Sequence, residues 1–301
     1  MGVPWINRVN TRILPCEFEY YEPTSIHEAI KLLGKLGPDA KILAGGTDLL
    51  VQIKMKQINP KYIINIKKIK ELYGLKDYGE HLSIGALTRL KELEENNIIK
   101  EKFTALHEAV KSMASPQIRN MATIGGNLCN ASPAADTAPP LMVFNAKLRI
   151  AGPYGVKDVP ITEFFRGPKK TILNYDEILT EIIIPYPTGH VGSAFIKIAR
   201  TSMDLAKVNA AAKLVVDKDG VVRDVAVALG SVAPTPVRAK SVEEYLRGRV
   251  FTKETAWNAA KLVVNDISPI TDIRSTAEYR RSVAKTIVYD VLLKAFERAK
   301  R

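Results

Sequence analysis

Two pairs of adjacent glycines constrain this chain more than any other feature. Gly45-Gly46 lies in the first glycine segment, ILAGGTDLL (42–50), and Gly125-Gly126 in the second, ATIGGNLCNASPAADTAPP (122–140). In each, a short extended apolar run reaches the glycines. Glycine permits positive φ and close backbone approach because it lacks a Cβ, and successive exposed N–H groups form an anion-binding nest. We therefore predict two loops that present backbone amides to a ligand with two phosphates and a long polar tail.

A purely structural interpretation of each segment is also open. Gly, Asn and Pro dominate tight turns between strands, and one such loop alone would be weak evidence for a ligand. The two segments share their chemistry, however. Thr47 and Asp48 follow the first glycines, and Asn127 and Asp136 follow the second. This repetition favours binding.

Length and composition limit the classes of protein to which the chain can belong. A chain of 301 residues that is 46% hydrophobic can bury a sizeable core and predicts two domains, with three as the alternative. It has no apolar run of the length needed to cross a bilayer and no recognisable signal peptide. These observations predict a soluble, cytoplasmic protein without a membrane span.

The sequence does not indicate several common kinds of functional site. Cys16 and Cys129 are far apart and the four histidines are scattered, which predicts no metal site. The sequence contains no GxGxxG, no P-loop and no GxSxG motif. The formal charge is +12, but the basic residues are dispersed without interleaved aromatics. We therefore predict an anion-attracting surface and no nucleic-acid partner.

The order of predicted elements indicates an α+β architecture. Residues 25–37 should form a helix with a capping box at Ser25 and Glu28, and residues 88–95 and 103–113 should be helical. The Pro/Gly-rich stretch 186–192 marks a domain boundary. Strands are expected at 17–23, 62–66, 81–86, 146–151, 157–160, 177–185, 193–200, 207–217 and 221–230, and further helices at 241–248, 253–264 and 277–298. The last two strands should form a hairpin around residues 218–220.

Six motifs carry a family resemblance. They are AGGTDLL (44–50), IGALTRL (84–90), TIGGN (123–127), SPAAD (132–136), FFRGPKKT (164–171) and VAPTPVRA (232–239). In this order they resemble the FAD-binding medium subunit of molybdenum hydroxylases, the group of carbon monoxide dehydrogenase, xanthine dehydrogenase and aldehyde oxidoreductase. The resemblance extends from about Phe18 to the C-terminus.

The resemblance implies a fold and its boundaries. Residues 1–187 would form a two-lobed FAD-binding domain of the vanillyl-alcohol-oxidase type, with lobes at about 16–70 and 71–187. Residues 190–301 would form a small α+β C-terminal domain, with helices on a three-stranded sheet.

The resemblance also implies a cofactor site for FAD, with no catalytic residue and no metal in this chain. Asp136 would bind the sugar-like part of the cofactor, and Met113 and Leu179 would flank the adenine. Lys197, in the stretch AFIK, would lie near the flavin, although Arg200-Thr201 replaces the family's paired arginines. The two glycine segments would hold the pyrophosphate through Ile42, Leu43, Ala44, Gly45, Gly46, Thr47, Asp48, Leu49, Thr123, Ile124, Gly125, Gly126 and Asn127.

The implied function is electron transfer. Electrons would come from a large molybdopterin-binding subunit through a small [2Fe–2S] subunit to this chain's FAD and then to an external acceptor, in a dimer of heterotrimers. Two distant cysteines disfavour the 4-hydroxybenzoyl-CoA reductase branch, which carries a [4Fe–4S] loop. Two alternatives remain. One is a stand-alone FAD reductase, similar to UDP-N-acetylenolpyruvoylglucosamine reductase in its GGGSNLL-like loop, and the other is a non-catalytic assembly or nucleic-acid-binding protein.

Overall fold

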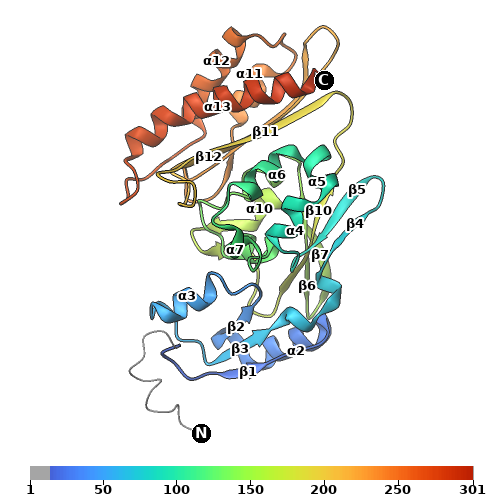
Figure 1. The fold of residues 1–301 in the computed structure, drawn as a ribbon, viewed down its shortest axis with the longest axis vertical. Coiled ribbons are helices and arrows are strands. Elements are labelled where there is room, and N and C mark those ends of the chain that lie inside the picture. Colours follow the sequence, from blue (N-terminus) through green and yellow to red (C-terminus); the bar gives the residue numbers. More distant parts are fainter. Residues whose placement is uncertain (1–13, 301) are drawn as a thin grey trace.

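The described part of the chain stacks its three larger sheets, each with its own helices, along the long axis of the molecule (Figure 1). The structure is a computed structural model that describes residues 14–300. We name the three parts the N-terminal, central and C-terminal units, which follow one another from bottom to top in Figure 1.

The N-terminal unit is a small parallel sheet with two helices. Its strands are β1 (Glu19–Tyr21), β2 (Ala40–Leu43) and β3 (Tyr62–Asn65), in the order β1-β3-β2. The helices are α2 (Ile26–Leu36) and α3 (Leu49–Lys54). The predicted helix start is confirmed, because Ser25 accepts a hydrogen bond from the Glu28 amide. The Glu28 carboxylate accepts from Thr24 N at 2.8 Å, one residue before the position that a capping box would use.

The central unit is an antiparallel sheet covered by short helices. The strand order is β4-β5-β10-β6-β7. These strands are β4 (Leu75–Asp77), β5 (His81–Gly85), β6 (Lys147–Gly152), β7 (Gly155–Pro160) and β10 (Ile178–Pro185), and a separate hairpin joins β8 (Phe165–Gly167) to β9 (Lys170–Thr171). The helices are α4 (Leu90–Glu95), α5 (Asn97–Lys102), α6 (Thr104–Lys111), α7 (Pro116–Arg119), α8 (Ile124–Cys129), α9 (Ala138–Val143) and α10 (Ile161–Phe164).

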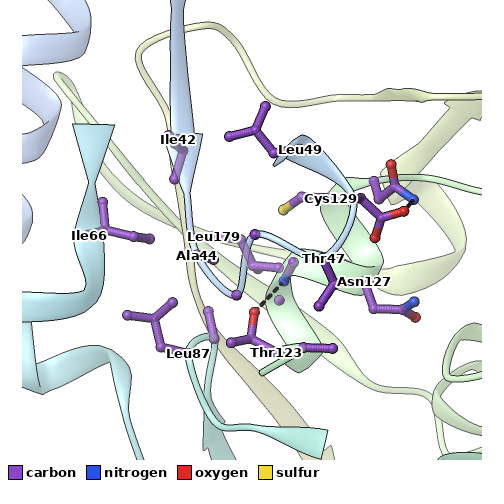
Figure 2. Close-up of a pocket in the computed structure, with 18 of the residues that line it drawn as sticks. Ile42, Ala44, Thr47, Leu49, Ile66, Leu87, Thr123, Asn127, Cys129 and Leu179 are labelled. Carbon is purple, nitrogen blue, oxygen red and sulfur yellow. Dashed lines mark hydrogen bonds between the residues drawn. The ribbon is translucent and has the colours of Figure 1, made fainter. Parts of the chain in front are cut away.

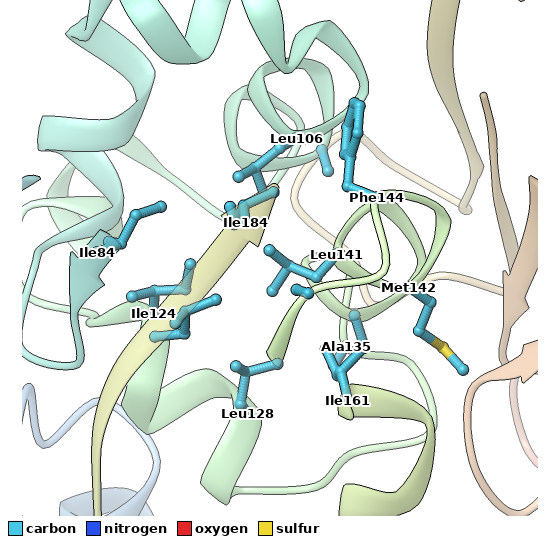
Figure 3. Close-up of a cluster of buried hydrophobic side chains, with 14 of the residues drawn as sticks. Ile84, Leu106, Ile124, Leu128, Ala135, Leu141, Met142, Phe144, Ile161 and Ile184 are labelled. Atoms are coloured by element: carbon cyan, nitrogen blue, oxygen red, sulfur yellow. The ribbon is translucent and has the colours of Figure 1, made fainter. Parts of the chain in front are cut away.

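The core of the central unit lies between its sheet and these helices. Ile84 and Ile184 point from neighbouring strands toward Leu106 of α6 and Leu141 of α9 (Figure 3). All four side chains are fully buried. Burial of such apolar side chains supplies most of the free energy that holds an element pair together, at about 1.5–3 kcal/mol each.

The C-terminal unit packs three helices on an antiparallel sheet. The strands are β11 (Val191–Ile198), β12 (Val208–Val216), β13 (Val222–Gly230) and β14 (Val237–Arg238), in that order. The helices are α11 (Lys240–Leu246), α12 (Lys253–Lys261) and α13 (Ala277–Ala299). A Cβ on Gly192 would stand 1.9 Å from Ala295 O, so α13 lies directly on β11. Among residues 14–300 there are also four 3₁₀ turns, at Gly37–Asp39, Ile66–Lys68, Lys70–Leu72 and Leu262–Asn265.

Most predicted elements are confirmed, and three details are wrong. The C-terminal sheet has a fourth strand, β14, whose two residues are too short to give an alternating pattern. The helix predicted at 103–113 is present as α6, but the separate helix α5 that precedes it, ending before Phe103, is not among the predicted elements. The extended run expected at Ala122–Ile124 ends at Thr123, which begins helix α8.

Candidate functional site

A cleft of about 270 Å³ separates the N-terminal unit from the central unit (Figure 2). Both glycine segments contribute to its walls. Its lining residues are Ile42, Ala44, Gly45, Gly46, Thr47, Asp48, Leu49, Gln52, Ile66, Ala86, Leu87, Ala122, Thr123, Gly125, Gly126, Asn127, Cys129, Asn130, Leu173, Glu177, Ile178 and Leu179.

The first glycine segment supplies a row of unused hydrogen-bond donors. It leaves the end of β2 and turns into α3, whose first bond runs from Leu50 N to Gly46 O. Within residues 14–300, the amides at positions 45–49 have no hydrogen-bond acceptor. The first amides of a helix lack intrahelical partners and carry partial positive charge. Successive N–H groups of this kind form a site for an anion.

The two glycines of this segment are required for different reasons. Gly46 has φ of +80°, a backbone conformation that side chains with a Cβ rarely adopt. Gly45 lies against the second glycine segment, because a Cβ there would stand 2.1 Å from the backbone oxygen of Met121. The first requirement shapes the row of amides, and the second brings the two units together at the cleft.

The second glycine segment has no such row. Ile124 N donates to Thr88 O at 3.0 Å and Gly125 N donates to Ala86 O at 2.9 Å. Gly126 N donates to the Thr123 hydroxyl at 3.1 Å, the bond drawn in Figure 2. A Cβ on Gly125 would stand 2.6 Å from Ala86 Cβ. Here the glycine permits helix α8 to pack on the central unit, and the amides are used within the protein.

The second segment offers side-chain donors in place of amides. The Thr123 hydroxyl accepts one bond and keeps its own proton for another acceptor. Asn127 Oδ1 accepts from the Thr137 hydroxyl at 2.7 Å, which fixes the amide of that side chain. Within the described part of the chain, Asn127 Nδ2 has no acceptor. Both donors line the cleft opposite the first glycine segment.

The other end of the cleft is apolar and holds one paired acid. Ile66, Leu87 and Leu179 point into it (Figure 2). Glu177 is 9% exposed and accepts hydrogen bonds from Lys157 Nζ and from Asn174 N. Burial acts to raise the pKa of Glu177, but these hydrogen bonds outweigh it and hold the pKa below its ordinary value.

Five of the predicted site residues do not line this cleft. Leu43 and Ile124 belong to the glycine segments, but their side chains are buried in hydrophobic clusters. Met113 packs against the core of the central unit. Asp136 and Lys197 contact each other, with 2.8 Å between Oδ2 and Nζ.

The Asp136–Lys197 pair joins the central unit to the C-terminal unit. Both side chains are at least nine-tenths buried, and Asn209 of β12 donates to Asp136 Oδ1 at 2.6 Å. Lys197 Nζ also donates to Ser112 O at 3.3 Å. Burial raises the pKa of Asp136, an effect that Lys197 and Asn209 oppose. Such a buried, bonded pair fixes how the two units meet.

Several lining residues lie outside the predicted set. Gln52 follows the first glycine segment and Asn130 lies within the second, but neither is in the predicted set, because a single polar side chain gives no distinctive pattern. Leu87 belongs to the recognised motif IGALTRL, whose position beside the cleft depends on how β5 packs. Glu177 comes just before strand β10, two residues ahead of the predicted Leu179, and could have been found from that neighbour. Cys129 directs its sulfur into the cleft (Figure 2).

These features define a class of protein. Unpaired amides at one end of a cleft, an apolar wall at the other and two neutral side-chain donors between them fit an elongated, phosphate-bearing cofactor. The chain belongs to the family described as the FAD binding domain in molybdopterin dehydrogenase, whose model matches residues 16–187. Residues 193–295 match the carbon monoxide dehydrogenase flavoprotein C-terminal domain.

Curated relatives and solved structures agree with this assignment. The chain is 36% identical to the carbon monoxide dehydrogenase medium chain of Hydrogenophaga pseudoflava, over 95% of this chain and 99% of that one. It is 37% identical to the xanthine dehydrogenase FAD-binding subunit of Escherichia coli O157:H7, over 92% and 95% of the two chains. A chain of the solved Hydrogenophaga carbon monoxide dehydrogenase superposes with a TM-score of 0.92, at 36% identity over 95% of this chain and 99% of that one.

Proposed function

We propose that this chain is the FAD-binding electron-transfer subunit of a heteromeric molybdenum-containing hydroxylase or dehydrogenase. The observation that carries the proposal is the row of unpaired amides at positions 45–49, which faces the side-chain donors of Thr123 and Asn127 across the cleft. When bound, FAD would supply reversible one- and two-electron chemistry, and the protein would bind and orient it.

The residues present fit this cofactor. The diphosphate would lie on the amides of the first glycine segment, where no lysine is needed to bind an anion. The second segment would contribute Thr123 and Asn127, and the apolar wall with Leu179 would take the adenine. We retain Met113 as the second residue that flanks the adenine, Asp136 as the residue that binds the sugar-like part and Lys197 as the residue near the flavin; these three side chains do not line the cleft.

The same proposal extends to domains and partners. We place the domain boundary between residues 187 and 190. Electrons would arrive from a small [2Fe–2S] subunit beside a large molybdopterin-binding subunit, in a cytoplasmic dimer of heterotrimers, and would leave to an external acceptor.

Across residues 14–300, no helix has the length and apolar character needed to span a bilayer. The relatives' names differ in substrate, from carbon monoxide to xanthine and nicotinate, so this chain defines the cofactor and not the substrate.

A stand-alone FAD reductase of the same fold is not favoured. Such an enzyme needs its own proton donor beside the flavin. The two carboxyl groups that line the described cleft are already engaged, since Glu177 bonds Lys157 and Asp48 accepts from Asn130. The relatives are also subunits by name.

Purification and cofactor analysis would test the proposal. The full chain would be expressed alone and with the genes beside it, then denatured, and the released cofactor identified by chromatography and absorbance. We expect FAD at about one per chain, with molybdopterin and iron–sulfur subunits co-purifying from the joint expression. A purified chain that neither contains FAD nor binds added FAD would contradict the proposal, and an isolated chain with full reductase activity would favour the stand-alone enzyme.

A further inference from the structure

Three side chains from distant parts of the chain meet at the rim of the cleft. Asn130, at the end of α8, donates from Nδ2 to Asp48 Oδ1 at 3.0 Å. Lys169, in the turn between β8 and β9, donates from Nζ to Asn130 Oδ1 at 2.7 Å. We call this group of Asp48, Asn130 and Lys169 the clamp. Asp48 comes from the N-terminal unit and the other two from the central unit, so the clamp bridges the cleft from one wall to the other.

The backbone around the clamp is held in an unusual conformation. Lys169 has φ of 61° and Ala131 has φ of 45°, values in the left-handed region that are costly for residues other than glycine. Lys169 N donates to Ala131 O at 2.9 Å, which pins the hairpin to the end of α8. Strained residues of this kind persist where the surrounding structure holds them, and they gather at functional sites. The strain here serves to present Lys169 to Asn130.

The charges of the clamp complement the site. Asp48 lies within the row of unpaired amides, and its carboxylate would repel a diphosphate bound there. Lys169 has no carboxylate within ion-pairing distance among residues 14–300 and bonds the same amide that holds Asp48. Its positive charge therefore offsets Asp48 at the position where a bound anion would add negative charge. Lys169 belongs to the motif FFRGPKKT, which also buries Phe164 and Phe165 and forms the β8–β9 hairpin.

We propose that Asn130 and Lys169 are positioning residues that close the cleft over the diphosphate part of FAD. They act through Asp48, by holding the first glycine segment against α8. This proposal rests on the proposed function, because the ligand is FAD. The cofactor lies between two units and must leave between them, so the clamp has to open for release. Its bonds lie at the surface, where opening is easy, and its main effect is on the rate of cofactor exchange.

Release of FAD from the loaded chain would test the clamp. The full chain would be saturated with FAD, freed of excess flavin and diluted, and released FAD followed by its fluorescence. We expect Lys169→Ala to release FAD about five- to tenfold faster, the effect of one lost hydrogen bond with a charged partner. Asn130→Ala loses the bonds to Asp48, Lys169 and Gln52 and should release FAD at least as fast. Lys170→Ala is the matched control, since this exposed neighbour in the same hairpin makes no side-chain hydrogen bond among the described residues. Lys169→Arg should restore most of the retention.

The possible results distinguish three cases: an effect of the clamp on FAD release, a purely structural effect of the substitutions, and failure of the proposed function. Because Lys169 bonds Asn130, a double variant no faster than Asn130→Ala alone would support a shared action. FAD-free variants that unfold at the same denaturant concentration as the parent chain would support it as well. Equal release from Lys169→Ala and Lys170→Ala would overturn the clamp while FAD binding stands. FAD-free variants that unfold earlier than the parent would overturn it in favour of a structural role. A parent chain that binds no FAD at all would overturn both proposals.

Discussion

The two glycine segments share a dipeptide and differ in what the dipeptide does. In the first, Gly46 adopts positive φ and the amides at positions 45–49 remain unpaired. In the second, Gly125 is helical, packs against Ala86 and has its amide bonded. The first glycines therefore create a binding surface, whereas Gly125 creates a packing surface that places Thr123 and Asn127 beside it. A Gly-Gly dipeptide can therefore form part of a ligand site or permit a close packing contact. The hydrogen-bond partners of its N–H groups distinguish the two cases.

Gly125→Ala would test the packing role and should have the largest effect. The new Cβ would stand 2.6 Å from Ala86 Cβ and 2.7 Å from Ala86 O. Overpacking of this kind costs about 3 kcal/mol of unfolding free energy. Denaturant unfolding would measure the loss. Gly34→Ala is the matched control, because nothing lies within 4 Å of its Cβ in helix α2, and it should stabilise the chain by about 0.5–1 kcal/mol. Similar behaviour of the two variants would contradict the packing role.

Gly46→Ala would test the binding role. At φ of +80° an alanine costs about 1–2 kcal/mol, and relief of that strain would move the amides around it. We expect FAD affinity to fall about tenfold, measured by titration of flavin fluorescence, while unfolding of the central unit is little changed. Unaltered affinity would show that the geometry of these amides is not what binds the cofactor.

Thr123→Val would separate the two roles of one side chain. The hydroxyl caps α8 by accepting from Gly126 N, and its loss should cost about 1 kcal/mol of stability. It would also remove a proposed donor to the cofactor, so affinity should weaken as well. Thr123→Ser keeps the hydroxyl and should retain both properties. A valine variant with parental stability would argue against the cap.

A pH series would distinguish the amides, which do not titrate, from Glu177, which does. The pKa of Glu177 is lowered in the folded chain, so its pairing stabilises the fold above the ordinary glutamate pKa of about 4.3. That stability is lost as the pH falls through the lower folded value. Because Lys157 is half exposed, Glu177→Gln should cost less than about 1 kcal/mol at pH 7. The difference between the two proteins should shrink as the pH falls below about 4.3 and disappear below the lowered pKa of Glu177 in the folded chain. A constant difference would exclude the ion pair as its source.

The sequence predicted the fold well where patterns are local. The helix α2 and the strand pair around residues 218–220 follow from capping residues and alternation within a few residues. It predicted the first glycine segment because positive φ and free amides are local properties. It did not predict the helix at Thr123, since the acceptors of those amides are Ala86 and Thr88, more than 30 residues earlier. Likewise Asp136 and Lys197 were both singled out, but nothing in the sequence shows that they bond each other.

The completed hydrogen bonds of the second segment bear on how the protein is made. Since Ile124, Gly125 and Gly126 are satisfied without a ligand, the central unit can reach its native structure on the ribosome before any flavin is present. The unpaired amides of the first segment can be hydrated until then. We therefore expect cofactor insertion to follow folding, so that a cell short of riboflavin would accumulate folded, empty subunits rather than misfolded chains.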